Sequence, residues 1–218
     1  MTIRTFIHST GQIQRLAVGD LTSGGVEIFS DLLQRSAGAG VVYSDPPWNP
    51  GNEKYWRRFA GVEPPTDYEA LLDAWCECVS ACKADHIFCE QSVIDRHRAL
   101  LLDATERCEG WYLPLIEQWT VQYGSPLRPN VLLHWGSENL ASDPSGLHGE
   151  AMTRKVFEGL SAMGALHDTT VSDPCTGLGM TSRLAHRFGA SFVGTELNSA
   201  RLARAIAWLL KQGYEERR

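Results

Sequence analysis

Short apolar runs that suit buried β-strands alternate along the chain with segments whose apolar residues recur at helical spacing. Such alternation is typical of α/β proteins, in which helices cover a mainly parallel sheet. Seven strands are predicted, at residues 13–18, 41–43, 87–89, 115–123, 130–135, 169–171 and 191–194. Helices are predicted at about 26–35, 67–84, 94–105, 153–163, 182–188 and 200–211. We interpret residues 49–65, rich in Pro, Gly and charge, as a loop.

Two of these elements carry local signals at their ends. The strands at 115–123 and 130–135 flank Gly124-Ser125-Pro126, which predicts a β-hairpin. Thr66, with Glu69 three residues later, fits a capping box and predicts a helix start at this point.

Acidic residues gather where the predicted strands end. In an open parallel sheet the carboxyl edge is where ligands bind. Uncompensated negative charges at one edge would repel one another, so a ligand there should bring donors or positive charge. The residues in question are Asp20, Asp45, Glu90, Asp173 and Glu196.

Length and composition point to one soluble domain. The 218 residues suit a single domain with a sizeable core, covering 1–218. The longest apolar runs are too short to span a bilayer, and the six cysteines accompany no export signal. We therefore expect a cytoplasmic protein with reduced thiols and no membrane association. Cys78, Cys82 and His86 share helical spacing, but no CxxC pair is present, so we expect core packing and no metal.

A glycine-rich turn after the strand at 169–171 suggests a cofactor site. Gly177 and Gly179 let the backbone approach a ligand, and Asp173 can accept from an ammonium group. Glu196 ends the next strand, where a carboxylate can bind both hydroxyls of a ribose. The turn lacks the glycine pattern of dinucleotide sites and the GK[ST] of phosphate loops. A ligand with an ammonium at one end and a ribose at the other fits better, and S-adenosylmethionine is such a ligand.

The segment Asp45-Pro46-Pro47-Trp48 carries the strongest chemical signal. Its two prolines remove backbone donors and leave the Asp45 carboxylate and the Pro46 carbonyl as acceptors. Two acceptors can hold both N–H bonds of an exocyclic amine and direct its lone pair outward, towards an in-line methyl donor. A base must leave the duplex to reach them, at a cost of a few kcal/mol. Stacking on Trp48 can recover roughly 1–3 kcal/mol of that cost.

Together these motifs resemble the DNA amino-methyltransferases, which modify N6 of adenine or N4 of cytosine. Asp45-Pro46-Pro47-Trp48 looks like their catalytic motif, and residues 173–181 look like their cofactor motif. The catalytic motif comes first, as in the β subgroup. The resemblance implies a Rossmann-like α/β fold, with a seven-stranded, mainly parallel sheet, helices on both faces and one antiparallel hairpin strand. The catalytic half would cover about 12–135 and the cofactor half about 148–212.

The same resemblance assigns residues to roles. Gly19-Asp20 resembles a cofactor-edge segment, residues 148–160 resemble the helix over the methionine end, and residues 194–197 match the ribose segment. It implies catalytic roles for Asp45, Pro46, Pro47 and Trp48. It implies cofactor contacts from Asp20, Asp45, His148, Asp173, Pro174, Cys175, Thr176, Gly177, Gly179, Thr181, Glu196, Leu197 and Asn198.

Some residues depart from the family pattern. Cys175 replaces the usual Phe, and Leu178 and Met180 replace smaller residues. For a separate target-recognition region only residues 137–149 are available. Adenine N6 in DNA is the favoured target. RNA adenine and cytosine N4 are the alternatives, although the cytosine group more often has Ser before the prolines. A non-catalytic subunit that keeps the fold is the alternative of a different class.

The charge balance complicates nucleic-acid binding, because the formal net charge is −6. Basic residues do gather after the catalytic motif, where they alternate with aromatic rings that can stack on bases. We predict a substrate-clamping loop there, with a further contact beside the hairpin. The predicted nucleic-acid-binding residues are Lys54, Tyr55, Trp56, Arg57, Arg58 and Arg128. Because one small patch is unsuited to a long site, we expect a homodimer or a partner subunit.

Overall fold

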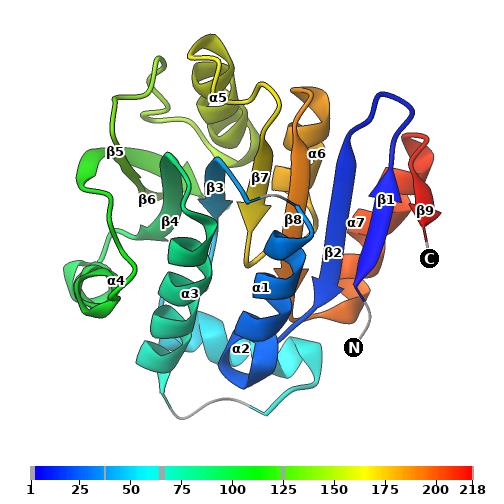
Figure 1. Cartoon of the computed structure of the whole chain (residues 1–218). Helices are drawn as coiled ribbons and strands as arrows, with labels where there is room; N and C mark the ends of the chain where they lie inside the picture. Colours follow the sequence, from blue (N-terminus) through cyan, green and yellow to red (C-terminus); the bar gives the residue numbers. More distant parts are fainter. Residues whose placement is uncertain (1–2, 37, 64–66, 124–125, 218) are drawn as a thin grey trace.

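The computed structural model describes residues 3–36, 38–63, 67–123 and 126–217. Within these ranges nine strands form one sheet with the order β5-β6-β4-β3-β7-β8-β2-β1-β9 (Figure 1). The strands are β1 Arg4–Ile7, β2 Ile13–Val18, β3 Val41–Ser44, β4 His86–Ser92, β5 Leu115–Tyr123, β6 Arg128–Gly136, β7 Thr170–Asp173, β8 Ser191–Glu196 and β9 Glu215–Arg217.

The five central strands β4, β3, β7, β8 and β2 run parallel, and β6 is antiparallel to β4 and to β5. The predicted α/β class and all seven predicted strands are confirmed. The sheet is wider than expected, because β1 pairs antiparallel with β2 and β9 with β1. All residues of strand β9 are exposed and charged, so its sequence lacks the alternation of apolar and polar residues that would predict a strand. The Arg4–Glu216 ion pair, at 2.6 Å, joins this edge to β1.

Helices cover both faces of the sheet. One apolar core contains buried residues of α1 Val26–Gln34, α3 Tyr68–Cys82 and α4 Asp95–Arg107. The second core contains buried residues of α5 Gly149–Ala162, α6 Met180–Arg187 and α7 Ser199–Lys211. Strand β3 lies between them: Val42 faces the first core, and Val41 and Tyr43 face the second. A run of four buried residues therefore marks a strand covered on both sides.

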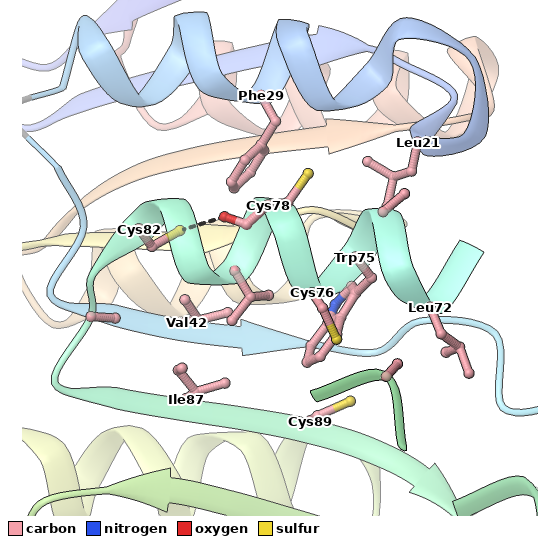
Figure 2. Close-up of a cluster of buried hydrophobic side chains, with 14 of the residues drawn as sticks. Leu21, Phe29, Val42, Leu72, Trp75, Cys76, Cys78, Cys82, Ile87 and Cys89 are labelled. Atoms are coloured by element: carbon pink, nitrogen blue, oxygen red, sulfur yellow. Dashed lines mark hydrogen bonds between the residues drawn. The ribbon is translucent and has the colours of Figure 1, made fainter. Parts of the chain in front are cut away.

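The cysteines of α3 are core residues. Cys76, Cys78 and Cys82 are buried, and Figure 2 shows Cys76 beside Trp75, with Cys89 of β4 on the same side of the helix. Burial raises the pKa of the Cys82 thiol to about 12, and this thiol donates to the Cys78 carbonyl at 3.3 Å. These thiols therefore stay protonated and pack as small apolar groups. The helix predicted at 67–84 extends beyond the observed one, since α3 ends at Cys82 and β4 begins at His86.

The interpretation of residues 49–65 as a loop is wrong, because α2 occupies Pro50–Ala60. The side chain of Asn49 caps its first turn, and Pro50 stands where a missing N–H is harmless. Gly61 ends it with a left-handed φ of 72°. The Pro and Gly that suggested a loop are thus helix-boundary signals. In Figure 1, α2 lies across the carboxyl edge of the parallel strands.

Two local predictions fall partly outside the described residues. Thr66 is outside them, and the side chain of Asp67 caps α3 by accepting from the Glu69 N–H. Strands β5 and β6 do pair as a hairpin, but Gly124 and Ser125 of its turn are outside the described ranges. Across the described chain, no helix has the length and apolar character needed to cross a membrane.

Candidate functional site

The carboxyl ends of β3, β7, β8 and β2 lie next to one another in the sheet. Asp45, Asp173, Glu196 and Asp20 stand at these ends, in that order across the sheet, and all line one cavity of about 630 Å³. This volume falls within the range of small-molecule sites. The predicted gathering of carboxylates is therefore present as a walled cavity, with α2 contributing to its rim.

Glu196 is held for ligand binding by backbone groups. Its Oε2 accepts from the Gly177 N–H at 2.7 Å, and its Oε1 accepts from the Asn198 N–H at 2.8 Å. Each carboxylate oxygen keeps a further lone pair for a ligand hydroxyl. Gly177 has a φ of 58°, and a Cβ there would lie 2.9 Å from Arg201. The turn therefore needs glycine to keep this part of the cavity wall open.

Asp173 lies deeper in the same wall. Its carboxylate accepts from the Cys175 N–H at 2.9 Å and from the Thr181 hydroxyl at 3.0 Å. Burial raises the pKa of Asp173 to about 7, against the lowering effect of these hydrogen bonds, and the charge of Asp45 adds to the rise. A cation placed near both carboxylates would offset this repulsion.

Hydrogen bonds and a ring contact hold the segment Asp45–Trp48 at the end of β3. The indole N–H of Trp48 donates to Asp45 Oδ1 at 2.6 Å, and the ring of Trp48 meets Tyr123 edge-on at 4.7 Å. The Tyr68 hydroxyl donates to the Pro47 carbonyl at 2.5 Å. Burial raises the pKa of Asp45 to about 6, while the Trp48 hydrogen bond and the charge of Arg201 lower it.

Glu90 was expected at the same edge, but it lies behind the cavity wall. The hydroxyl of Tyr43, which does line the cavity, donates to Glu90 Oε1 at 2.8 Å. Burial raises the pKa of Glu90 well above its usual range, and the charge of Asp45 raises it further. Burial and the nearby charge of Asp45 therefore both favour the protonated form of Glu90.

Helix α2 is connected to the carboxyl end of β2 by hydrogen bonds between Arg57 and Asp20. The guanidinium of Arg57 donates to Asp20 Oδ1 at 2.9 Å and to Oδ2 at 2.8 Å, and Thr22 donates twice more to Oδ1. Arg57 also donates to the Glu63 carbonyl at 2.7 Å. One turn before it, Glu53 lines the cavity and is buried.

The cavity brings together most of the residues predicted for catalysis and cofactor binding. Three predicted cofactor residues lie outside its wall: His148, Gly179 and Asn198 occupy the N-caps of α5, α6 and α7. Those that line it are Asp20, Asp45, Pro46, Pro47, Trp48, Asp173, Pro174, Cys175, Thr176, Gly177, Thr181, Glu196 and Leu197.

The predicted nucleic-acid residues divide into three groups. On α2, Tyr55 and its neighbour Phe59 are each 58% exposed. Lys54 and Arg58 on the same helix are also exposed, as is Arg128 at the start of β6. Trp56 lines the cavity, with the Arg201 guanidinium 4.3 Å from its ring centroid. Arg57 is buried in its pair with Asp20, which favours a role in holding α2 over direct phosphate contact.

Several residues of the wall had no signal in the sequence. Tyr123 reaches the cavity from the hairpin, Arg201 from α7 and Glu53 from α2. Each sits on an element whose position over the site depends on tertiary packing. Only the helical spacing of Glu53 and Arg57, four residues apart, could have placed these two together had α2 been predicted.

Comparison with known proteins places the fold. No family model and no curated protein matches the sequence. Among solved structures, M1.HpyAVI is 13% identical with a TM-score of 0.60, covering 90% of this chain and 98% of its own. TTHA0409 from Thermus thermophilus, assigned as a DNA modification methylase, is 18% identical with a TM-score of 0.60, covering 91% and 95%. The cytosine-N4-specific PvuII DNA methyltransferase is 13% identical with a TM-score of 0.57, covering 88% and 85%. The chain therefore has the α/β fold found in these DNA methyltransferase structures.

Proposed function

We propose that this protein is an S-adenosylmethionine-dependent methyltransferase that modifies an exocyclic amino group in DNA, with N6 of adenine as its target. One observation carries the proposal: the acceptor motif at Asp45 and the carboxylates Asp173 and Glu196 open into one cavity. A methyl acceptor and a cofactor with an ammonium and a ribose would therefore meet at the end of β3.

The residues present fit this cofactor. Glu196 keeps lone pairs for the two ribose hydroxyls, while Gly177 leaves room for a ligand beside it. Burial raises the pKa values of both Asp45 and Asp173, so an ammonium and a sulfonium bound beside them would stabilise their ionised forms. M1.HpyAVI and TTHA0409 were each solved in complex with S-adenosylmethionine, and both share the fold.

The cofactor would supply an electrophilic methyl group, and the protein would orient the amine that attacks it. Trp48 occupies Asp45 Oδ1, so Oδ2 and the Pro46 carbonyl are the acceptors we assign to the two N–H bonds. With its pKa near 6, Asp45 is ionised at neutral pH and can take the proton that the nitrogen loses on methylation. The indole of Trp48, fixed by Asp45 and Tyr123, offers its face to the flipped base.

The choice of base rests on the motif. The neighbours of similar fold include a cytosine-N4 enzyme, so the fold favours neither base. Asp at position 45, in place of the Ser more usual for cytosine N4, supports adenine. DNA is the favoured nucleic acid because structures of similar fold include a DNA modification methylase and a DNA methyltransferase.

Mass spectrometry of nucleosides tests this proposal. The protein is incubated with DNA or RNA and methyl-labelled cofactor, and Asp45→Ala serves as the control that lacks the proposed acceptor. We expect labelled N6-methyladenine from DNA, and none with Asp45→Ala. Label on cytosine N4 or in RNA would overturn the choice of substrate. Absence of label from both nucleic acids, with cofactor bound, would favour a non-catalytic subunit.

We propose that the nucleic acid crosses the exposed face of α2. Tyr55 and Phe59 lie parallel at 6.3 Å, with Lys54 and Arg58 exposed beside them. Such a mixture of rings and cations suits unpaired bases and their phosphates. Removing both charges should reduce the slope of log affinity against log salt by about two. An unchanged slope would place the nucleic acid elsewhere.

The expected dimer or partner subunit remains part of this proposal. The net charge of −6 disfavours a long phosphate footprint on one chain, and two α2 faces could share one duplex. Sedimentation with and without DNA, at several salt concentrations, measures the stoichiometry. A fully active, sequence-selective complex with one chain per site would rule the dimer out.

A further inference from the structure

Glu53 is a carboxyl group buried without compensation. Its side chain is on α2, the residue is 3% exposed, and Oε1 has no hydrogen-bond partner. A buried carboxyl left unsatisfied destabilises the fold, so such a group calls for an explanation. Burial raises the pKa of Glu53 to about 7, although the charge of Arg57 opposes the rise. Because Glu53 lines the cavity, a bound ligand is the natural partner.

The position of Glu53 indicates which part of the ligand it meets. The charged groups acting on it are Arg57, Asp20, Asp67 and Lys54. It therefore lies near Asp20 and Arg57, and neither Asp45 nor Asp173 is among the charged groups that act on it. The sheet order β3-β7-β8-β2 sets out the proposed cofactor in sequence, with the methionine end by Asp173 and the ribose at Glu196. The adenine ring then falls beyond Glu196, towards Asp20 and α2.

Asp20 itself has little capacity left at that end. Three donors converge on its Oδ1, one from Arg57 and two from Thr22, and one further donor from Arg57 reaches Oδ2, so that a single lone-pair position is left, on Oδ2. Glu53, by contrast, has a free oxygen. The terminal torsion of a Glu side chain is broad, so a turn of the carboxyl group can present that oxygen to the cavity.

We propose that Glu53 accepts a hydrogen bond from the 6-amino group of the cofactor's adenine, and that Asp20 and Arg57 act as positioning residues that hold α2 in place. This inference rests on the proposed function, since it assumes the same cofactor. It assigns to α2 two tasks on its two faces, cofactor binding inside and nucleic-acid contact outside.

Calorimetric titration of the full chain tests the assignment without turnover. The two ligands are S-adenosylhomocysteine and its deaminated form, S-inosylhomocysteine, which has an oxygen in place of the 6-amino group. At pH 8, where Glu53 with its pKa of about 7 is mostly ionised, we expect the wild type to prefer the adenine form by about tenfold or more, the usual strength of a hydrogen bond to a charged group. Glu53→Ala should lose that preference by binding the adenine form more weakly. Glu53→Gln keeps a carbonyl acceptor and should retain part of it.

Controls separate this inference from the proposed function. Glu106→Ala, an exposed acid on α4, should bind both ligands as the wild type does. Glu53→Ala should melt at or above the wild-type temperature, because an unpaired buried group is removed. Unchanged preference in Glu53→Ala, an equal loss for both ligands, or a lower melting temperature would each overturn the inference. A wild type that binds neither S-adenosylmethionine nor S-adenosylhomocysteine would instead overturn the proposed function.

Discussion

The Asp20–Arg57 pair should be a principal link between α2 and the sheet. The two side chains are 17% and 9% exposed, and two parallel hydrogen bonds of 2.8 and 2.9 Å join them. Removing one partner of a buried pair costs about 3–5 kcal/mol, because the other charge stays buried alone. Since some water reaches this pair, we expect about 3 kcal/mol for Arg57→Ala. For a chain of this length that corresponds to a fall in Tm of about 6–12 °C.

A double-mutant cycle isolates the interaction. Unfolding in urea, followed by circular dichroism, gives the free energy of unfolding for Asp20→Ala, Arg57→Ala and the double variant. We expect the double variant to lose about 2 kcal/mol less than the sum of the single losses. Hydrogen bonds from Arg57 and Thr22 outweigh burial and keep the pKa of Asp20 below its usual range. The coupling should therefore be present above about pH 4 and vanish as the pH falls through the folded pKa. Losses that add within about 0.5 kcal/mol at pH 7 would refute the reasoning.

Other predictions concern the proposed cofactor site, the target base and a buried histidine. Asp173→Ala and Glu196→Ala should each weaken cofactor binding about tenfold or more in calorimetry; unchanged affinity in both would move the cofactor elsewhere. Trp48→Ala should reduce methylation of a paired target more than that of a mispaired one, because a mismatch lowers the flipping cost; equal losses would make Trp48 a packing residue. Burial lowers the pKa of His134 despite its Glu117 hydrogen bond, so the unfolded chain binds the proton first and stability falls below about pH 6.5. Between pH 7 and pH 5.5 the urea midpoint of His134→Gln should fall less than that of the wild type. An equally steep fall in both proteins would contradict this. At pH 6.5, binding of S-adenosylmethionine should release protons as Asp173 ionises, seen as a binding enthalpy that varies with the buffer; no variation would count against a cation at this carboxylate.

The sequence predicted the central strands and the β5–β6 hairpin at one edge, and it missed the β1 and β9 strands at the other edge. Strands such as β3 are covered on both faces and appear as continuous apolar runs, which pattern analysis detects. Strand β9 has exposed, charged residues and exists because backbone groups of β1 pair with it. No side-chain pattern encodes that pairing. Helix α2 could not be predicted for another reason: Pro50 and Gly61 are typical loop residues, and here they stand at the two ends of the helix.

The site shows the same division. Asp45, Asp173 and Glu196 could be predicted together because the carboxyl ends of parallel strands must meet at one edge. Tyr123 and Arg201 could not, because a hairpin and the last helix bring them to the cavity only after packing. Arg57 illustrates the limit most clearly. Its sequence context of rings and cations suggested phosphate binding, whereas the fold turns its charge inward onto Asp20.

Placing Arg57 inward changes how an acidic domain could hold nucleic acid. Asp45, Asp173 and Glu196 lie at an edge where Arg201 is a nearby cation, and Arg201 already lies against Trp56. Phosphates approaching this edge would meet net negative charge while the cofactor site is empty. A bound cofactor carrying an ammonium and a sulfonium would offset part of that charge. If the proposed function holds, these electrostatics favour cofactor binding before nucleic acid, and the Asp20–Arg57 pair would keep α2 in position for both proposed ligands.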